Sequence, residues 1–363
     1  MSSKPKIVFI INSIQQQRCL KRIEKFIDNG YEVEAYGFSR SETIPTKPKR
    51  FTIQVLDTFT AGMSYATRFV RMLKALRPVM KKYKHERVVY YYFLLDVAMA
   101  GRLISSKPYI YEESDLMQTY LPQRWLVNCL DKIDRYLIRH SHITTMTSEG
   151  FAQYHFGTTY PSNIVFVPNR LNRNILDLPY SPTPTDIKHL RFAFVGGARF
   201  DSVVHFAQTI ATYFPQHEMH FYGTLSDHKK EFETLIDTYE NVYYHGPFSN
   251  PADLPSIYEN VDLVLATYDN QYANVRYAEP NKLYEAAYFK TPIIVSEGTY
   301  LASKVEKWGI GYALNALDTE AVKRFVGNLC MNSIQERIDS CSSIEKSSLM
   351  DINPDLFRRI GNL

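Results

Sequence analysis

The sequence predicts an α/β protein built from two doubly wound domains, and three observations support this prediction. Short apolar runs suited to buried parallel strands alternate with helical segments, beginning with a β-α-β pattern over residues 6–37. Residues 178–185, LPYSPTPT, hold three prolines and are typical of a semi-stiff linker. A chain of 363 residues is also long for a single domain. We expect an N-terminal domain over residues 1–175, a C-terminal domain over 176–342, and a helix over 343–363 that joins the first domain.

Each domain is expected to alternate strands with helices. In the first domain we expect strands at residues 6–12, 31–37, 51–56, 87–93, 108–111, 143–146 and 163–167, and helices at 18–28, 63–87, 96–104, 123–139 and from 147 onward. In the second we expect strands at residues 190–195, 218–222, 241–245, 261–266 and 292–295, and helices at 202–213, 281–290 and 319–339. Pro78 is expected to kink or divide the helix over residues 63–87.

Composition sets limits on the class of protein. Hydrophobic residues make up 45% of the chain and charged residues 22%, which allows buried cores and argues against global disorder. The four cysteines are scattered, with no CxxC pair, which argues against a zinc site and against a disulfide framework. The N-terminal apolar run is short, and the longest apolar stretch, residues 88–101, is interrupted by Asp96. The sequence therefore predicts a reduced, cytoplasmic setting, with no signal peptide and no membrane span.

The charge is unevenly distributed. Residues 1–170 contain 25 Lys and Arg against 14 Asp and Glu, whereas residues 171–363 contain 17 against 24. The basic excess concentrates in residues 63–87, which also place apolar residues at helical spacing. One interpretation is a helix that lies on an anionic membrane surface. The other, weighed about equally, is a crossover helix whose apolar face packs on its own sheet. Nucleic acid ranks last as a partner, because no recognition motif accompanies the charge.

Polar residues at two strand ends of the first domain are candidates for binding or activating an acceptor. Glu113, Ser114 and Asp115 follow the strand at residues 108–111, where open α/β sheets bind ligands. A carboxylate there could orient or deprotonate a hydroxyl group, and the alternative is an N-cap for the next helix. Gln17 and Arg18 follow the first strand and could also touch an acceptor, although a solvated helix start explains them slightly better.

The second domain contains a stronger candidate site. Three of its strands are followed by glycine, at Gly196-Gly197, Gly223 and Gly246, so that backbone can approach a ligand closely. Residues 276–296, RYAEPNKLYEAAYFKTPIIVS, then predict a loop, a helix and a buried strand. A helix N-terminus offers unpaired N–H groups and a positive dipole end, which suit phosphate. The first loop of the chain, by contrast, lacks the G-x-G-x-x-G fingerprint of dinucleotide sites.

Several segments in this order resemble one known family. SEGFAQYHFG followed by IVFVPN, the loop GGAR, the run YYHGPFSNPADLPSIYENVDLVLATYD, the helix PNKLYE and the turn TPIIVSEG together are similar to glycosyltransferases of family 4. The resemblance covers nearly the whole chain. It implies the GT-B fold, in which two Rossmann-like domains face a central cleft. It also implies a retaining enzyme that takes a sugar from a nucleoside-diphosphate sugar, commonly without a metal.

The resemblance implies roles for particular residues. Glu285 would bind the ribose hydroxyls, Arg199 and Lys282 would lie by the diphosphate as catalytic cations, and Phe248 would lie near the base. The rest of the expected donor site consists of Gly196, Gly197, His205, Gly223, Gly246, Glu279, Asn281 and Leu283. On the acceptor side, Glu113 and Asp115 are the expected catalytic carboxylates, and Gln17, Arg18 and Ser114 are the expected binding residues.

Three positions depart from the family's pattern. His205 stands where a lysine is usual, Tyr277 stands where a glutamate is usual, and Ser114 stands where relatives often carry histidine. The favoured function is a cytoplasmic glycosyltransferase acting on a lipid-linked or polysaccharide acceptor for surface polysaccharide or glycolipid synthesis. A peripheral position at the inner face of the membrane is one option for its location. The alternatives are a sugar-nucleotide epimerase on the same fold, or a non-catalytic protein that kept the fold. No metal or other cofactor is expected.

Overall fold

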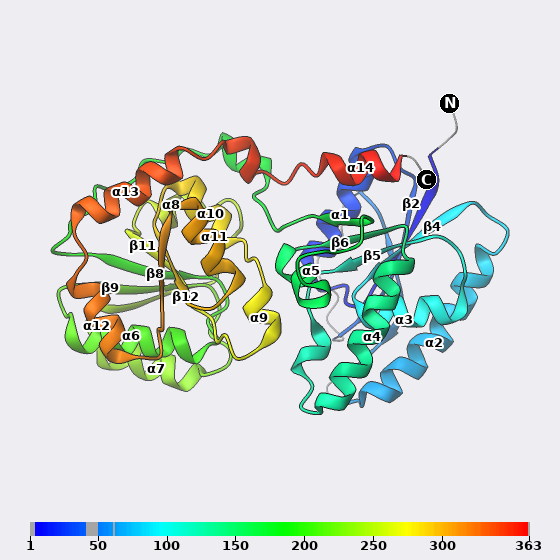
Figure 1. Cartoon of the computed structure of the whole chain (residues 1–363), viewed down its shortest axis with the longest axis horizontal. Helices are drawn as coiled ribbons and strands as arrows, with labels where there is room; N and C mark the ends of the chain where they lie inside the picture. The colour runs from blue at the N-terminus through cyan, green and yellow to red at the C-terminus, as the bar shows by residue number, and fades with distance from the viewer. Residues whose placement is uncertain (1–3, 41–49, 61, 362–363) are drawn as a thin grey trace. The chain divides into compact units, whose positions relative to one another are not determined.

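The computed structural model of the chain describes residues 4–40, 50–60 and 62–361, which form two compact α/β units (Figure 1). Unit 1 comprises residues 1–167 and 353–363, and unit 2 comprises residues 168–352. The chain thus changes unit after residue 167 and again after residue 352, where the sequence placed these changes at 175 and 342. The two crossing segments pair within unit 2, since the Leu171 N–H donates to the Leu349 carbonyl and the Asp351 N–H donates to the Leu171 carbonyl.

Unit 1 contains a parallel sheet with the order β3-β2-β1-β4-β5-β6-β7 among its described residues. Its strands are β1 (Lys6–Ile11), β2 (Val33–Ser39), β3 (Ile53–Thr58), β4 (Val88–Phe93), β5 (Tyr109–Glu113), β6 (Ile143–Met146) and β7 (Ile164–Phe166). Its helices are α1 (Gln17–Asp28), α2 (Tyr65–Lys82), α3 (Leu95–Ile104), the short η1 (Met117–Tyr120), α4 (Arg124–His140), α5 (Glu149–Phe156) and α14 (Pro354–Ile360). Strand β4 is buried along its whole length, as expected for a parallel strand covered on both faces.

Unit 2 repeats the architecture with the strand order β10-β9-β8-β11-β12-β13. The strands are β8 (Arg191–Val195), β9 (Glu218–Tyr222), β10 (Val242–Gly246), β11 (Leu263–Ala266), β12 (Ile293–Ser296) and β13 (Gly311–Leu314). The helices are η2 (Arg173–Asp177), α6 (Asp201–Tyr213), α7 (Lys229–Thr238), α8 (Leu254–Tyr258), α9 (Ala273–Tyr277), α10 (Lys282–Phe289), α11 (Tyr300–Trp308), α12 (Thr319–Gly327), α13 (Met331–Ser342) and η3 (Lys346–Leu349).

Three expected elements differ from the structure. Pro78 lies inside α2, which continues through it to Lys82, so the proline does not divide the helix. The helix expected over residues 319–339 is two helices, α12 and α13, separated at residues 328–330. The C-terminal segment is not one helix either, because η3 belongs to unit 2 and only α14 belongs to unit 1. Local helical spacing continues across such breaks, and for the C-terminal segment the division between the two units accounts for where the helices end.

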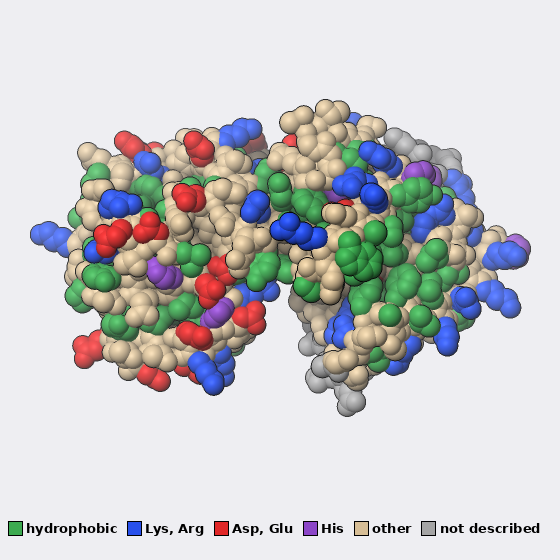
Figure 2. Space-filling view, turned by 60° about the horizontal axis from the view of Figure 1, so that its bottom comes forward, with side chains coloured by type: hydrophobic (Ala, Val, Ile, Leu, Met, Phe, Trp, Pro, Cys, Tyr) green, Lys and Arg blue, Asp and Glu red, His purple; other side chains and the backbone are tan. Residues whose placement is uncertain are grey.

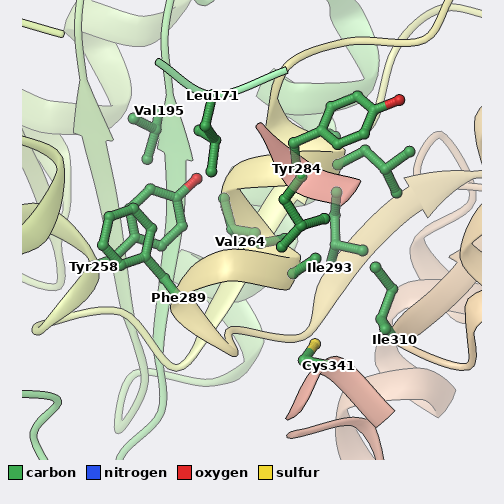
Figure 3. Packing of buried hydrophobic residues seen from close by; sticks show 14 of the residues in the cluster. Leu171, Val195, Tyr258, Val264, Tyr284, Phe289, Ile293, Ile310 and Cys341 are labelled. Atoms are coloured by element: carbon green, nitrogen blue, oxygen red, sulfur yellow. The ribbon is translucent and has the colours of Figure 1, made fainter. Parts of the chain in front are cut away.

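Each unit has its own buried core. In unit 1, Leu356 and Ile360 of α14 are fully buried among residues of β1, α1 and β4, and Phe357 packs edge-on against Phe26. In unit 2, apolar residues of β11, β12, α8 and α10 form one cluster, part of which is drawn in Figure 3. The rings of Tyr258 and Phe289 stack there with centroids 4.5 Å apart. These contacts pack α10 against the sheet.

Candidate functional site

The strand order of unit 2 places its ligand-binding edge at the carboxyl ends of β8 and β11. Strand β8 pairs with β9 on one side and with β11 on the other, so the connections diverge there. Open parallel sheets bind ligands at such a switch point. The Gly196-Gly197 turn follows β8, Tyr268 follows β11, and the chain then runs through α9 to the start of α10. The glycines and the start of α10, which the sequence predicted to form a site, therefore lie at the same edge of the sheet of unit 2.

Lys282, the first residue of α10, extends over this switch point. Its ammonium lies 4.7 Å from the ring centroid of Phe194 on β8 and 5.9 Å from that of Tyr268. The residue is only 6% exposed. Within the described residues no carboxylate lies at ion-pair distance from this ammonium, and it makes no hydrogen bond. Glu285 on the same helix acts on this cation electrostatically but does not pair with it directly. Burial of the cation costs hydration, and an anionic ligand group would offset that cost.

Two of the glycines at the strand ends, Gly196 and Gly223, have close contacts that leave no space for a side chain. A Cβ on Gly196 would lie 2.9 Å from the Lys282 ammonium nitrogen, and a Cβ on Gly223 would lie 2.2 Å from the Gly196 carbonyl oxygen. Both residues have positive φ, at 137° and 122°. The Gly223 N–H also donates to the Gly246 carbonyl at 2.7 Å. By contrast, a Cβ on Gly197 would meet only the Thr224 hydroxyl, at 3.6 Å, so Gly197 is the glycine at this turn with space above it.

Arg199 and His205 lie in different surroundings. Arg199 is exposed, its guanidinium lies 5.0 Å from the ring centroid of Phe200, and in the described part of the chain it has no carboxylate partner. His205 points to the loop between β13 and α12, where its Nδ1 lies 3.0 Å from the Ala316 carbonyl and its Nε2 lies 3.4 Å from the Thr319 hydroxyl. The structure therefore leaves Arg199 available to a ligand and engages His205 in an internal contact.

The start of α6 is capped by a residue that sequence reasoning missed. Asp269, from the loop after β11, accepts hydrogen bonds from the backbone N–H groups of Asp201 and Ser202 at 3.2 and 3.0 Å. A carboxylate at a helix N-terminus satisfies unpaired N–H groups. The cap comes from a residue 68 positions away, so no local pattern such as a capping box could have revealed it.

Glu285 lies on the buried face of α10 and is 1% exposed. Its carboxylate accepts hydrogen bonds from the Tyr258 hydroxyl, at 3.0 Å, and from the Asn281 side-chain amide. Burial raises the pKa of Glu285, and nearby Lys282 opposes this rise. Leu283, on the same helix, is fully buried in the core. In this structure the Glu285 carboxylate is thus satisfied by the protein, which makes it an anchor for the first turn of α10.

Glu279 and Phe248 complete the residues expected on the donor side. Glu279 is 4% exposed, accepts a hydrogen bond from Tyr284, and forms an ion pair with Lys304 at 2.8 Å. Phe248 is half-buried and packs on the core cluster beneath α8 and α10. Of the expected donor residues, Lys282, Arg199 and Gly197 present groups that a ligand could engage, whereas Glu279, Glu285 and His205 have partners inside unit 2.

In unit 1, Glu113 belongs to a fully buried polar cluster. Its Oε1 lies 2.7 Å from His155 Nε2, and Asp134 Oδ2 lies 3.7 Å from the same nitrogen. Burial raises the pKa of Glu113 and of Asp134 well above their ordinary values and lowers that of His155. Ligand atoms of these three residues lie within 4.8 Å of one another, so they are the group of described side chains that could hold a metal ion. The cluster places Glu113 inside the domain.

The other acceptor-side candidates lie near the carboxyl ends of β1 and β5. Arg18 pairs with Asp115 at 3.4 Å, and its Nε lies 3.8 Å from Glu112. Ser114 is 3% exposed and its hydroxyl has no partner among the described residues. Gln17, the first residue of α1, is exposed. The structure therefore brings Arg18 and Asp115 together and leaves Gln17 on the surface.

A cavity of about 440 Å³ lies in unit 1 beside the switch point between β1 and β4. Its polar end holds Asp96, whose carboxylate accepts a hydrogen bond from the Val97 N–H at 2.9 Å and lies 3.4 Å from the Asn12 amide and 3.7 Å from the Arg40 guanidinium. Burial raises the pKa of Asp96. The sequence showed Asp96 only as a break in an apolar run; a lone carboxylate after a buried strand was the signal for this site.

Backbone strain occurs at the same cavity. Leu94, which lines it and directly precedes α3, has φ 69° and ψ 162°, a conformation that is essentially restricted to glycine and costs about 1–3 kcal/mol. Leu94 is 1% exposed, and its N–H donates to the Glu112 carbonyl at 2.9 Å. Such strain persists only where surrounding structure enforces it, and it clusters at ligand sites.

No protein-family model and no curated protein sequence matches this chain. Solved structures do match, over at least 94% of the length of each of the three named below. HepE of Anabaena, in a structure in complex with UDP, is 15% identical with a TM-score of 0.69, and the match covers 99% of this chain and 100% of that one. Sucrose-phosphate synthase of Thermosynechococcus elongatus is 13% identical, with a TM-score of 0.64 and coverage of 99% and 94%. The lipopolysaccharide outer core galactosyltransferase WaaB is 15% identical, with a TM-score of 0.65 and coverage of 98% of both chains.

These likenesses show the fold, which is GT-B with two Rossmann-like α/β units, as the sequence predicted. None of the described helices combines the length and the apolar character needed to cross a membrane.

Proposed function

We propose that this chain is a glycosyltransferase that moves a sugar from a nucleoside-diphosphate sugar to an acceptor. The observation that carries the proposal is Lys282, a buried lysine with no ion-pair partner within 4 Å among the described residues, which lies at the switch point of unit 2 beside Gly196. Exposed Arg199 follows the same turn. Cations fixed in this way would neutralise the diphosphate as it leaves the sugar. HepE, which shares the fold, was solved in complex with UDP and with UDP-glucose.

The finer parts of the proposal come from the resemblance to family 4. They are a retaining mechanism, no metal requirement, and a lipid-linked or polysaccharide acceptor used in surface polysaccharide or glycolipid synthesis. NMR of the product reports the anomeric configuration, and activity in EDTA reports metal dependence. Product analysis with donor alone distinguishes transfer from epimerisation of the sugar nucleotide. Binding of a sugar nucleotide without sugar transfer, hydrolysis or epimerisation would indicate a non-catalytic protein.

The substitution Lys282→Met tests the donor site. Methionine keeps an apolar stem over Phe194 and removes the charge. A hydrogen bond to a charged group contributes about 1.5–3 kcal/mol, so we expect the affinity for UDP to fall about 10- to 150-fold. Thermal stability without ligand is expected to change little, because removing a buried charge and removing the cation beside the Glu285 carboxylate act in opposite directions. Isothermal titration calorimetry measures the affinity, and a panel of sugar nucleotides in a thermal-shift assay identifies the donor.

Lys307→Met is the matched control, since Lys307 is an exposed lysine of unit 2 on α11. Its affinity for UDP should equal that of the wild type. Equal loss in both variants would indicate a general charge effect, and full retention of affinity by Lys282→Met would remove Lys282 from the donor site.

We also propose that unit 1 lies peripherally on an anionic membrane at the cytoplasmic face. In α2 the apolar residues Met72, Leu76, Val79 and Met80 are buried within the unit, as the crossover interpretation expected. The exposed cations of this segment are Lys74, Arg77, Lys81, Lys82, Lys84 and Arg87. In Figure 2 apolar side chains gather beside Lys and Arg side chains on unit 1. Vesicle binding that rises with anionic lipid content and falls with salt is the expected result.

A further inference from the structure

The cavity of unit 1 has mostly apolar walls. Phe59 follows β3, Phe69 and Met72 come from α2, Leu95 begins α3, and Leu121 follows η1. Its volume of about 440 Å³ is within the range of pockets that enclose a small organic ligand. Apolar walls of this extent favour a hydrocarbon chain over a free sugar, because a sugar needs a hydrogen-bond partner for each buried hydroxyl.

The charged groups lining the cavity do not balance. The charged side chains among its described lining residues are Arg40, Arg68 and Asp96, which gives one more cation than anion. Arg40 faces Asp96 at 3.7 Å. The terminal nitrogen of Arg68 donates to the Thr60 carbonyl at 3.3 Å, and its Nε is buried without a partner. An anionic group at this end of the cavity would accept hydrogen bonds from both guanidinium groups.

The rim of the cavity is apolar and exposed. Met117 and Tyr120 of η1 line the cavity and are 48% and 44% exposed, and Tyr65 at the start of α2 is 53% exposed. Trp125, at the start of α4, is 68% exposed on the same unit. Aromatic side chains with polar tips are frequent where protein meets a lipid interface. A hydrocarbon chain could therefore enter along side chains that already expose apolar surface.

We propose that this cavity binds an amphiphile, with its hydrocarbon chain between α2 and η1 and its phosphate at Arg40 and Arg68. If the protein transfers sugars as proposed above, this amphiphile is its lipid-linked acceptor. That assignment alone rests on the proposed function, because the shape and charge of the cavity do not depend on it.

Calorimetric titration of the full chain with farnesyl phosphate tests the proposal. Farnesol supplies the same chain without charge, inorganic phosphate supplies the head group alone, and glucose tests the sugar alternative. We expect farnesyl phosphate to bind at least about tenfold more tightly than any of the three, because only it engages both ends of the cavity. Equal binding of farnesol, or tighter binding of glucose, would overturn the proposal.

Two pairs of variants locate the binding. Arg68→Gln removes a charge at the cavity, and Arg77→Gln removes one from the same helix, about two and a half turns away. Met117→Asp places a carboxylate on the apolar rim, and Leu103→Asp places one at a position of α3 that is 71% exposed and outside the lining. The first variant of each pair should weaken farnesyl phosphate binding by about tenfold or more. Unchanged binding of farnesyl phosphate in both Arg68→Gln and Met117→Asp would overturn the assignment of the amphiphile to this cavity.

Titration of the same preparations with UDP separates the two proposals. Binding of UDP without binding of farnesyl phosphate would refute the amphiphile site and leave the glycosyltransferase proposal standing. Binding of farnesyl phosphate that depends on Arg68, without binding of UDP, would confirm the amphiphile site and refute the donor site. Binding of farnesyl phosphate that is lost in Lys282→Met but retained in Arg68→Gln would place the phosphate in unit 2 and refute the assignment to unit 1.

Discussion

At the scale of single residues, the position of Glu285 shows how a candidate ligand group can have an internal partner. Helical spacing puts Glu285 just over one turn into α10, close to where a ligand would meet the helix. Tyr258 and Asn281 nevertheless donate to both carboxylate oxygens, and the side chain is 1% exposed. A buried carboxylate of this kind is held by hydrogen bonds but still loses the hydration of its charge.

The raised pKa of Glu285 predicts a pH-dependent cost. An acid whose folded pKa exceeds its unfolded value binds more protons in the folded state, so stability declines as pH rises above the unfolded value of about 4.5. Glu285→Gln removes this cost. We expect its apparent melting temperature, relative to the wild type, to rise between pH 4 and pH 8. Differential scanning calorimetry across this range measures the change.

Glu297→Gln serves as the control for that experiment, because Glu297 is an exposed glutamate of the same unit. Its difference from the wild type should be nearly constant with pH. A flat difference for Glu285→Gln as well would show that burial of Glu285 does not cost stability.

At the scale of elements, the ends of β8, β9 and β10 contact one another through Gly196, Gly223 and Gly246. The Gly223 N–H donates to Gly246, while Gly223 itself packs directly on the Gly196 carbonyl. This packing positions the turn toward which Lys282 points. Gly223, one of the glycines that suggested close approach to a ligand, is therefore needed first for close approach of two loops to one another.

Gly223→Ala should destabilise unit 2. A Cβ there would lie 2.2 Å from a backbone oxygen, at a φ of 122°, and strained conformations of this kind cost about 1–3 kcal/mol before any clash is relieved. Urea unfolding should show a lower midpoint for unit 2, and UDP should bind more weakly because the turn at Gly196 shifts.

Gly327→Ala is the matched control at the end of α12, where an added Cβ meets nothing within 4 Å. Alanine is favoured over glycine in a helix by about 0.5–1 kcal/mol, so this variant should be slightly more stable than the wild type. A Gly223→Ala variant as stable as Gly327→Ala would contradict the packing argument.

At the scale of the whole molecule, the end of the chain completes the core of the unit with which the chain begins. Helix α14 buries Leu356 and Ile360 among residues of β1 and α1, and Phe26 packs against Phe357 at a centroid distance of 5.2 Å. The core of unit 1 is therefore complete only with helix α14 in place. Unit 2, by contrast, is formed from one continuous segment, residues 168–352.

Leu356→Ala should weaken unit 1 selectively. Removing a fully buried leucine side chain costs about 2–5 kcal/mol. Hydrogen exchange followed by mass spectrometry should show faster exchange in β1, α1 and β4, with unchanged exchange in unit 2. Arg358→Ala, at an arginine whose side chain is 73% exposed, should leave both units unchanged. Equal acceleration in both units after Leu356→Ala would show that they unfold together.

The sequence by itself determined the class of fold and the edge of the sheet at which unit 2 presents its glycines and Lys282. Strand and helix periodicities are local, and parallel strands share one carboxyl edge, so this much follows from the order of segments. The sequence did not reveal that the C-terminal segment is divided between the units, because α13 and η3 pack on unit 2 and α14 packs on unit 1.

Only the tertiary structure decided which polar side chains face a ligand and which face the protein. Glu285 meets Tyr258, Glu279 meets Lys304, and Glu113 meets His155 across distances in sequence that no local pattern spans. Asp96 is identified as a cavity residue only from the strand order, which places β4 beside β1, and from α2, which forms another wall of the cavity. The physical reason is the same in each case, since burial and hydrogen-bond partners depend on which strands become neighbours.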